Sequence, residues 1–241
     1  MKENNKIQLS DHFTYGKMMR FTFPPIVMMI FTSIYGVVDG FFVSNFVGKS
    51  AFTAVNFVMP VIMILGGLGF MFGTGGSALI AKTLGEGNSE RANGIFSMLI
   101  LFSALCGVAI AGIGLAVLRP VVALLGAEGE LLENSILYAR VVIIGIPALF
   151  LQYEFQSLLV TAEKPKLGLW VTVAAGVTNM ALDALFVAAF RWGIVGAAVA
   201  TVLSECIGGL LPVVYFFCKN TSRLRFTKPV FSGRDLLRIC T

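Results

Sequence analysis

The chain alternates between long apolar stretches and short polar segments. Apolar residues in the stretches do not alternate with a period of two, which argues against strands of a membrane barrel. Each stretch is long enough to cross a hydrocarbon core about 30 Å thick as a helix. The pattern therefore predicts an all-α membrane protein built as a six-transmembrane-helix bundle. The expected spans are about 18–46, 50–81, 92–118, 135–160, 167–190 and 193–218, between a polar N-terminal tail (1–17) and a basic linker (219–241).

Composition agrees with a membrane protein. Hydrophobic residues make up 57% of the chain and charged residues 13%, where an ordinary soluble domain carries about 25% charged residues. Glycine and phenylalanine are abundant, as is common where helices pack in lipid. The cysteines form no CxxC pair and are expected to be small apolar fillers. They are Cys106, Cys206, Cys218 and Cys240.

Basic residues predict the orientation of the bundle. With six spans, both termini share a side with the second and fourth loops, and this side holds 14 of the 18 Lys and Arg residues. The other side holds Lys49, Arg119, Arg140 and Arg191. Both termini are therefore expected to be cytoplasmic. The net charge of +5 suits anionic lipid headgroups, and no feature indicates nucleic acid. The polar first 20 residues predict no removable signal peptide.

Three polar segments fit this arrangement. The segment 82–91 reads as a short turn with glycines, in which Asn88 or Ser89 caps the next helix. The segment 120–126 is too short to span and is expected at the outer interface. The segment 191–193 predicts a minimal turn, so the fifth and sixth helices should form a tight antiparallel hairpin.

Two aspartates, Asp39 and Asp183, lie inside the apolar stretches. An ionisable group at membrane depth costs roughly 2.5–3.5 kcal/mol on insertion scales, so it marks a candidate functional site. Asn179 precedes Asp183 by one helical turn, which puts the amide and the carboxylate on one helix face. Oxygen donors of this kind suit a hard cation or a proton.

Helical rise predicts that these groups converge. At 1.5 Å per residue, Asp183 lies about 12 Å from the outer end of its helix and Asn179 about 18 Å. Thr201 lies about 12 Å below the outer end of the next helix, and Asp39 about 10 Å below the end of the first. Asp39, Asp183 and Thr201 should thus share one layer of the outer half. The alternatives are that each aspartate reaches an interface, and that Thr201 bonds only the carbonyl one turn earlier.

Two further acids lie within the predicted spans. Glu154 belongs to a polar patch with Gln156 towards the cytoplasmic end of the fourth helix, and Glu205 follows Thr201 by one turn near mid-bilayer. Either acid can line a path for a cationic substrate, or hydrogen-bond internally as a neutral acid. Glu154, Glu205 and Gln156 are therefore candidate substrate-path residues.

Prolines and glycines mark positions where the helices bend or pack closely. Prolines within the spans remove backbone hydrogen bonds, so kinks are expected at positions 24, 25, 60, 147 and 212. Pro24 and Pro25 share a helix with Asp39, so cation binding at Asp39 can bias a bend there. Glycines of the second span are expected to let a neighbouring backbone approach, at positions 66, 67, 69, 73, 75 and 76.

Several segments together resemble the N-terminal lobe of a multidrug and toxic compound extrusion (MATE) transporter. The resemblance is to the bacterial branch of multidrug exporters and DNA-damage-inducible-protein-like members. No segment is diagnostic alone, and the specificity comes from their order and spacing. The segments are Pro24, 33–39 (SIYGVVD), 54–56 (AVN), Pro60, 76–78 (GSA), 84–88 (LGEGN), 124–127 (LLGA), 176–186 (GVTNMALDALF) and 193–201 (GIVGAAVAT).

The resemblance implies one lobe of a twelve-helix, two-lobe transporter in the bacterial plasma membrane, which is not an enzyme. Such a transporter exports small organic, cationic or amphipathic compounds by alternating access, coupled to Na⁺ or H⁺, with no other cofactor. The family's cation or proton site matches Asp39, Asn179, Asp183 and Thr201, which would hold Na⁺ if coupling is to sodium. The proline of its first helix matches Pro24.

The chain departs from the family pattern in two ways. Glu205 stands where many relatives have Gln, which puts the local charge in question. The family has twelve helices and six are predicted here, so the expected partner, besides the lipid bilayer, is a missing C-terminal lobe or a second half-transporter.

Three other functions were weighed. A flippase for lipid-linked oligosaccharides or peptidoglycan precursors shares the superfamily fold, but no basic residue lies mid-span to bind pyrophosphate. An inactive fragment or scaffold is the second. An intramembrane enzyme is the third, and it is disfavoured because His12, the single histidine, lies in the N-terminal tail.

Overall fold

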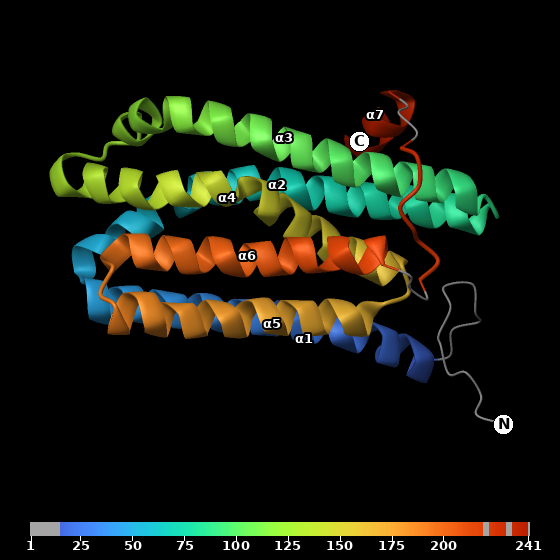
Figure 1. Ribbon diagram of the computed structural model, residues 1–241, viewed down its shortest axis with the longest axis horizontal. Helices are drawn as coiled ribbons and strands as arrows, with labels where there is room; N and C mark the ends of the chain where they lie inside the picture. The colour runs from blue at the N-terminus through green and yellow to red at the C-terminus, as the bar shows by residue number, and fades with distance from the viewer. Residues whose placement is uncertain (1–14, 219–221, 230–232, 241) are drawn as a thin grey trace.

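The computed structural model describes residues 15–218, 222–229 and 233–240, and Figure 1 shows them as a bundle of long helices lying side by side. Six helices in this part of the chain are long and apolar enough to cross a membrane, which confirms the predicted six-helix, all-α architecture. The elements are α1 (Tyr15–Phe42), η1 (Val43–Val47), α2 (Lys49–Gly85), α3 (Ser89–Leu124), α4 (Gly129–Thr161), α5 (Pro165–Asp183), η2 (Ala184–Ala189), α6 (Gly193–Phe217) and α7 (Gly233–Cys240). His12 and most of the N-terminal tail lie outside the described residues.

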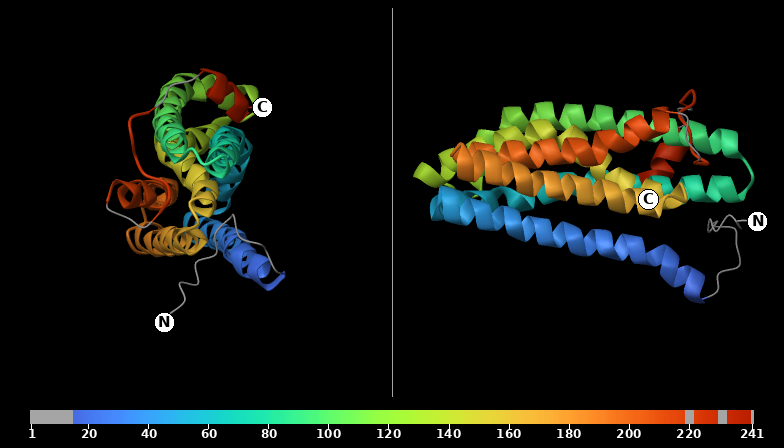
Figure 2. Two further views of the ribbon diagram at one scale, coloured as in Figure 1. Left: turned by 90° about the vertical axis from the view of Figure 1, so that its right-hand side faces the viewer. Right: turned by 60° about the horizontal axis from the view of Figure 1, so that its bottom comes forward.

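Helix α4 lies at the centre of the bundle, as the end-on view in Figure 2 shows. It packs against α2 and α3 on one side and against α6 on the other. Helix α5 packs against both α6 and α1, and α1 packs mainly on α5. We call α2 and α3 the α2–α3 layer, and α1, α5 and α6 the α1–α5–α6 layer. The two layers therefore share α4 as their common wall.

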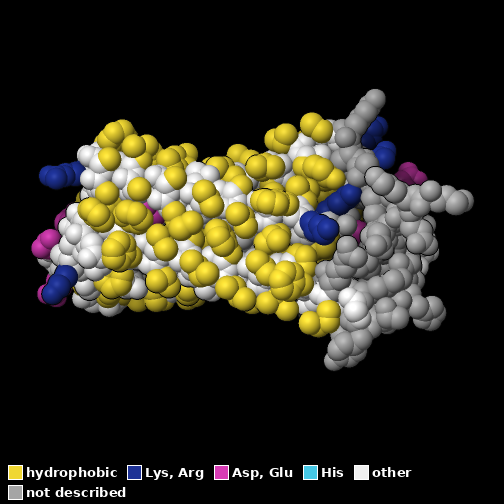
Figure 3. Space-filling view, turned by 90° about the horizontal axis from the view of Figure 1, so that it is seen from below, with side chains coloured by type: hydrophobic (Ala, Val, Ile, Leu, Met, Phe, Trp, Pro, Cys, Tyr) yellow, Lys and Arg dark blue, Asp and Glu magenta, His cyan; other side chains and the backbone are white. Residues whose placement is uncertain are grey.

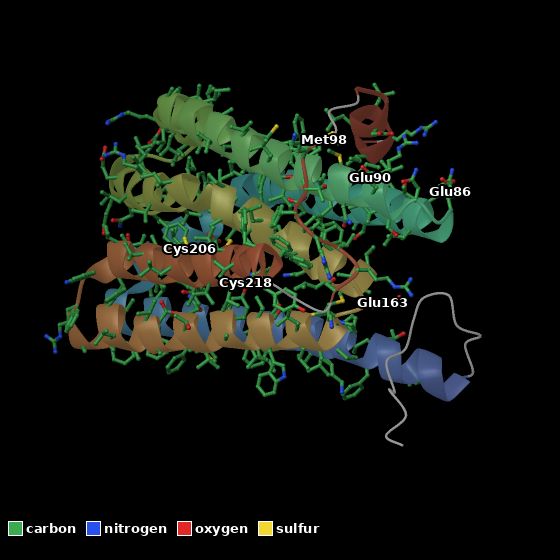
Figure 4. All side chains as sticks on the ribbon, turned by 45° about the vertical axis from the view of Figure 1, so that its right-hand side comes forward. Glu86, Glu90, Met98, Glu163, Cys206 and Cys218 are labelled. Carbon is green, nitrogen blue, oxygen red and sulfur yellow. The ribbon has the colours of Figure 1, made fainter. Side chains whose placement is uncertain are left out.

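Apolar side chains cover the middle of the bundle, and charged side chains gather at its ends (Figure 3). Large side chains such as Met29, Val37 and Ile64 are more than 70% exposed, which suits contact with lipid chains. The start of α1, the end of α6 and the α2–α3 and α4–α5 turns all lie at one end, where Glu86, Glu90 and Glu163 are labelled in Figure 4. This is the arrangement that an even number of spans requires.

Helix ends differ most from the predicted spans in two places. Helix α3 continues past Pro120 to Leu124, so the segment 120–126 is the end of a long helix rather than a separate interfacial piece. Pro120 has no backbone N–H to donate to the carbonyl of residue 116, and α3 continues past it without that hydrogen bond. Helix α4 begins at Gly129, earlier than the expected residue 135. Asn88 caps α3 as expected, since its side chain accepts a hydrogen bond from the Arg91 backbone N–H at 3.0 Å.

Glycines of α2 contact neighbouring helices as the sequence predicted, with one exception. A Cβ atom at Gly69 would lie 2.8 Å from the Cα of Phe150, and one at Gly73 would lie 2.7 Å from the Cα of Glu154. The backbones of α2 and α4 therefore touch. Gly67 faces open space, because a Cβ atom there would meet no neighbouring helix within 4 Å.

The region predicted as a linker contains α7, which the sequence analysis did not foresee. Asp235 of α7 is buried and accepts a hydrogen bond from the Arg91 guanidinium at 3.1 Å. Before α7, the backbone N–H groups of Arg225 and Thr227 donate to the side chains of Asn93 and Ser97, both at 2.9 Å. This segment is therefore held against α3, and α7 against α2.

Candidate cation site

Helices α1 and α5 bring the two intramembrane aspartates together. Asp39 is 9% exposed and Asp183 is completely buried. Their carboxyl groups lie within hydrogen-bonding reach of each other, although 143 intervening residues separate them in sequence. Gly176 permits this packing, because a Cβ atom there would lie 2.6 Å from the ring of Phe31 and 2.9 Å from that of Tyr35.

The oxygens of this cluster lack hydrogen-bond donors. Both carboxyl oxygens of Asp183, Oδ1 of Asp39 and Oδ1 of Asn179 are buried without a donor among the described residues. Two ionised carboxylates in contact repel each other, and burial in apolar surroundings increases the repulsion. The arrangement therefore favours a shared proton or a small cation between the two acids.

Asn179 and Thr201 complete the set of residues expected at the site. Asn179 is 1% exposed and lies one turn before Asp183 on α5. The Thr201 hydroxyl donates to the backbone carbonyl of Ala197 at 3.0 Å, which is the local bond considered as the alternative. Its oxygen keeps a lone pair to offer. Thr201 is also the hydrogen-bond partner of Tyr138, which connects it to the cluster.

Tyr138 of α4 is the member of the site that sequence reasoning missed. It is 1% exposed and interacts electrostatically with Asp39 and Asp183 as well as bonding Thr201. A tyrosine within an apolar span was the available signal. Its meaning depends on how α4 is rotated against α1 and α5, which only the packed structure gives.

Each aspartate lies one turn or less before a π-helical segment. Asp39 lies one turn before η1, and Asp183 is the residue before η2. The two segments contact each other at the C-terminal ends of α1 and α5. π-Helical turns leave backbone groups less regularly bonded and recur at functional sites. The helices beside the acids are therefore locally adaptable.

Glu205 adjoins the cluster, whereas Glu154 does not. Glu205 is 7% exposed and interacts with Tyr35, Tyr138 and Tyr153. Gly145 leaves room for its carboxyl group, since a Cβ atom there would lie 3.1 Å from Oε2. Glu154 is completely buried on the side of α4 that faces the α2–α3 layer.

The three candidate path residues are not brought together. Gln156 is half-buried beside α5 and α6, in a small hollow that it shares with Gly168 and Gly208. Glu154 lies across α4 from this hollow. A single path lined by Glu154, Glu205 and Gln156 is therefore not what the packing provides.

Pro24 and Pro25 lie far from the cluster along α1. About 22 Å of helix separates Pro24 from Asp39. Pro24 is buried and Pro25 half-buried, near a groove of about 480 Å³ between the beginnings of α1 and α5. The groove is lined by Met19, Phe23, Pro24, Lys166, Leu169 and Trp170.

The donor set indicates the class of cation. Among the described residues no group of three or more His, Cys, Asp or Glu side chains is placed to hold a metal ion. Two carboxylates, an amide and a hydroxyl are hard oxygen donors, which suit a proton or an alkali cation better than a transition metal. Such an ion would be transported cargo. Fold and site together therefore define a membrane helix bundle with a buried pair of carboxyl groups that suits a cation.

Comparison with known proteins places the chain in a family. The sequence matches the MatE family over residues 24–185, which is more than half of its length. The chain therefore belongs to the MatE family of multi-pass membrane transporters, which are not enzymes.

Relatives and solved structures agree. The chain is 26% identical over 233 residues to the "Multidrug export protein MepA" of Staphylococcus saprophyticus, a match that covers 95% of this chain and 51% of that protein. A transporter described as the outward-facing conformation of a multidrug resistance MATE family transporter superimposes with a TM-score of 0.86 at 27% identity, covering 92% of this chain and 49% of the other. A structure described as the inward-facing conformation of a multidrug resistance MATE family transporter superimposes with a TM-score of 0.80 at 27% identity, covering 89% of this chain and 51% of the other. The chain thus spans about half the length of the proteins it matches.

Proposed function

We propose that the chain forms one lobe of a cation-coupled antiporter that exports organic, cationic or amphipathic compounds by alternating access. Na⁺ or H⁺ entering from outside binds among Asp39, Asn179, Asp183 and Thr201, and its binding favours outward release of the organic compound. The observation that carries this proposal is the contact between two buried carboxyl groups on different helices.

The acid pair can couple binding to helix movement through charge. With a proton or Na⁺ bound, the repulsion between Asp39 and Asp183 is cancelled and α1 stays packed on α5. Without the cation, repulsion favours separation of the two helices. Pro24, which lacks a backbone N–H inside α1, provides a position where that helix can bend.

A second six-helix unit is part of the proposal, because the matched multidrug exporters are about twice as long as this chain. Helix α1 supports this, since only 17% of its span is buried, against 67% for α4. Its exposed side chains are Phe23, Ile26, Met29, Ile30, Ile34, Val37 and Phe41. We infer that both termini face the cytoplasm in a bacterial plasma membrane, from the distribution of basic residues.

Transport in everted membrane vesicles from cells that express the chain together with the second six-helix unit tests the coupling. Imposing a Na⁺ gradient or a pH gradient separately, with ethidium as a fluorescent organic cation, identifies the driving ion. We expect gradient-driven ethidium movement in the wild type, and its loss in Asp39→Asn and Asp183→Asn. Each substitution keeps the shape of the side chain and removes its charge.

A matched control separates coupling from general loss of charge. Glu133→Gln removes an acid near the start of α4, where Glu133 is exposed and pairs with Arg119 at 3.2 Å. This variant should transport like the wild type. If both aspartate variants retain gradient-driven transport at the level of Glu133→Gln, the cation site is assigned wrongly.

A further inference from the structure

Glu154 lies on the opposite side of α4 from the candidate cation site. Its side chain is completely buried. Gly73 of α2 packs its backbone against the Glu154 Cα atom, and Ser103 of α3 lies within reach of the carboxyl group. The position is about 10 Å along the helix from Thr161, where α4 ends.

No cationic side chain in the described part of the chain pairs with this acid. Neither carboxyl oxygen of Glu154, nor the hydroxyl of Ser103, has a hydrogen bond of good geometry to another described residue. Helix α2 presents the backbone of Gly73. Glu205 of α6 interacts instead with Tyr35, Tyr138 and Tyr153. Tyr153 itself lies against Gly66 of α2.

Phenylalanine rings of α2, α3 and α4 pack together along the same helix interface as the buried Glu154. Phe72 is the neighbour of Gly73 in α2, and its ring lies 5.5 Å from that of Phe102, the neighbour of Ser103 in α3. It also lies 6.3 Å from the ring of Phe150, one turn before Glu154. An ionised carboxylate without a counter-charge is strongly disfavoured in such a setting, whereas a neutral carboxylic acid is tolerated.

We propose that Glu154 is a proton-binding site, separate from the Asp39–Asp183 pair, at the interface of α2, α3 and α4. When the three helices are packed, the carboxylate holds a proton taken from hydronium, so that an O–H bond forms on the carboxyl group and water leaves. The neutral acid donates its O–H to the oxygen of Ser103. When α2 and α3 move away from α4 and water enters, the proton returns to water.

The protonation of Glu154 would depend on how closely the α2–α3 layer packs on α4, and not on whether the cation site is occupied. Gly73 keeps the backbones of α2 and α4 in contact at Glu154, so water reaches the carboxyl group only if this contact opens. The proposal concerns the charge of one side chain and does not depend on the transport function proposed above.

Infrared difference spectroscopy of the full chain in lipid nanodiscs tests this directly. With glutamate labelled by ¹³C, the C=O stretch of a protonated glutamic acid is distinguished from that of Asp39 or Asp183. At neutral pH we expect protonated-glutamate absorption in the wild type, of which one component is lost in Glu154→Gln and shifts in Ser103→Ala, while any component from the buried Glu205 is the same in all three proteins. Glu163→Gln, at the end of α4 where Glu163 pairs with Arg223 at 3.7 Å, is the matched control and should leave this absorption unchanged.

Thermal unfolding at several pH values gives an independent readout. The folded wild type keeps a proton that the unfolded chain releases, so its stability should fall relative to Glu154→Gln as the pH rises. If Glu154→Gln does not fold, the Ser103→Ala shift decides the matter. The proposal is overturned if neither substitution changes the protonated-glutamate absorption. It is also overturned if the stabilities of the wild type and Glu154→Gln depend on pH in the same way.

Discussion

Helix α1 and the α2–α3 layer are attached to their neighbours in different ways. In the α2–α3 layer, glycines bring backbones into contact, as at Gly69 and Gly73 against α4, and at Gly107 against Pro147. In the α1–α5–α6 layer, α1 meets α5 through side chains, as at Gly168 against Met28 and at Gly176 against aromatic rings. Side-chain contacts can be exchanged with little backbone movement, whereas backbone contacts fix the helices.

Buried acids follow the same division. Asp39 and Asp183 lie between the less firmly attached helices, where each can influence the other across an interface. Glu154 lies at a tight interface and has no acid beside it among the described residues. This difference indicates that α1 is the element able to respond to a cation, while the α2–α3 layer stays packed on α4 as long as the Gly73 contact is closed. The following predictions test it.

The largest expected effect is the loss of cation-dependent stability in the α1–α5–α6 layer. A cation that binds only the folded chain stabilises it by about 2.7 kcal/mol at one hundred times its dissociation constant. The melting temperature of the wild type should therefore rise with added Na⁺, or with falling pH if the cation is H⁺. Asp183→Asn should show no such rise, while Asp235→Asn, in α7, should retain it. A full response in Asp183→Asn would contradict the assignment.

A smaller effect is expected from enlarging a glycine in the α2–α3 layer. Gly73→Ala places a methyl group 2.7 Å from the Cα of Glu154, which forces α2 and α4 apart. We expect a loss of about 1–3 kcal/mol in the free energy of unfolding, measured by chemical denaturation in mixed micelles. Gly67→Ala is the matched control, because Gly67 faces open space and alanine favours the helix. Equal stabilities of the two variants would show that the α2–α4 contact is not tight.

The fold could be predicted from the sequence because each helix must by itself be long and apolar enough to cross the lipid bilayer. Apolar length and the absence of alternation are local properties, so six helices followed from the pattern. The depth of each residue below the end of its helix likewise placed Asp39 near Asp183, because an α-helix has a fixed rise per residue and the turns could be identified in the sequence. The structure puts these two residues side by side, and their role in cation binding stays a prediction.

The sequence could not predict how each helix is rotated about its own axis, and therefore which neighbour each side chain faces. The patch containing Glu154 and Gln156 reads as one polar group, yet packing sends the two side chains to opposite sides of α4. Tyr138 was missed for the same reason. Helix α7 escaped notice because its polar, eight-residue sequence lacks the apolar length of a span.

A still smaller effect is expected at the attachment of α7 to the α2–α3 layer. Asp235 is 2% exposed, but its partner Arg91 is 49% exposed, so solvent weakens the ion pair. Arg91→Ala leaves Asp235 buried without this partner and should release α7, at a cost of about 1 kcal/mol. Hydrogen exchange of the α7 backbone measures the release. Lys82→Ala, which removes an exposed pair at 4.0 Å, is the control and should leave exchange unchanged.

The smallest effect is expected at Thr201, where a local bond competes with the cation. The Thr201 hydroxyl already donates to Ala197, so it can offer a cation only its remaining lone pair. Thr201→Val keeps the shape and removes the oxygen, and we expect cation affinity to fall about threefold, equivalent to about 0.6 kcal/mol. Thr201→Ser keeps the oxygen and should bind like the wild type. Isothermal titration with Na⁺, or proton uptake measured with a pH-sensitive dye, distinguishes the two. If Thr201→Val binds unchanged, the hydroxyl serves only its protein partners Ala197 and Tyr138, and the site consists of the acid pair and Asn179.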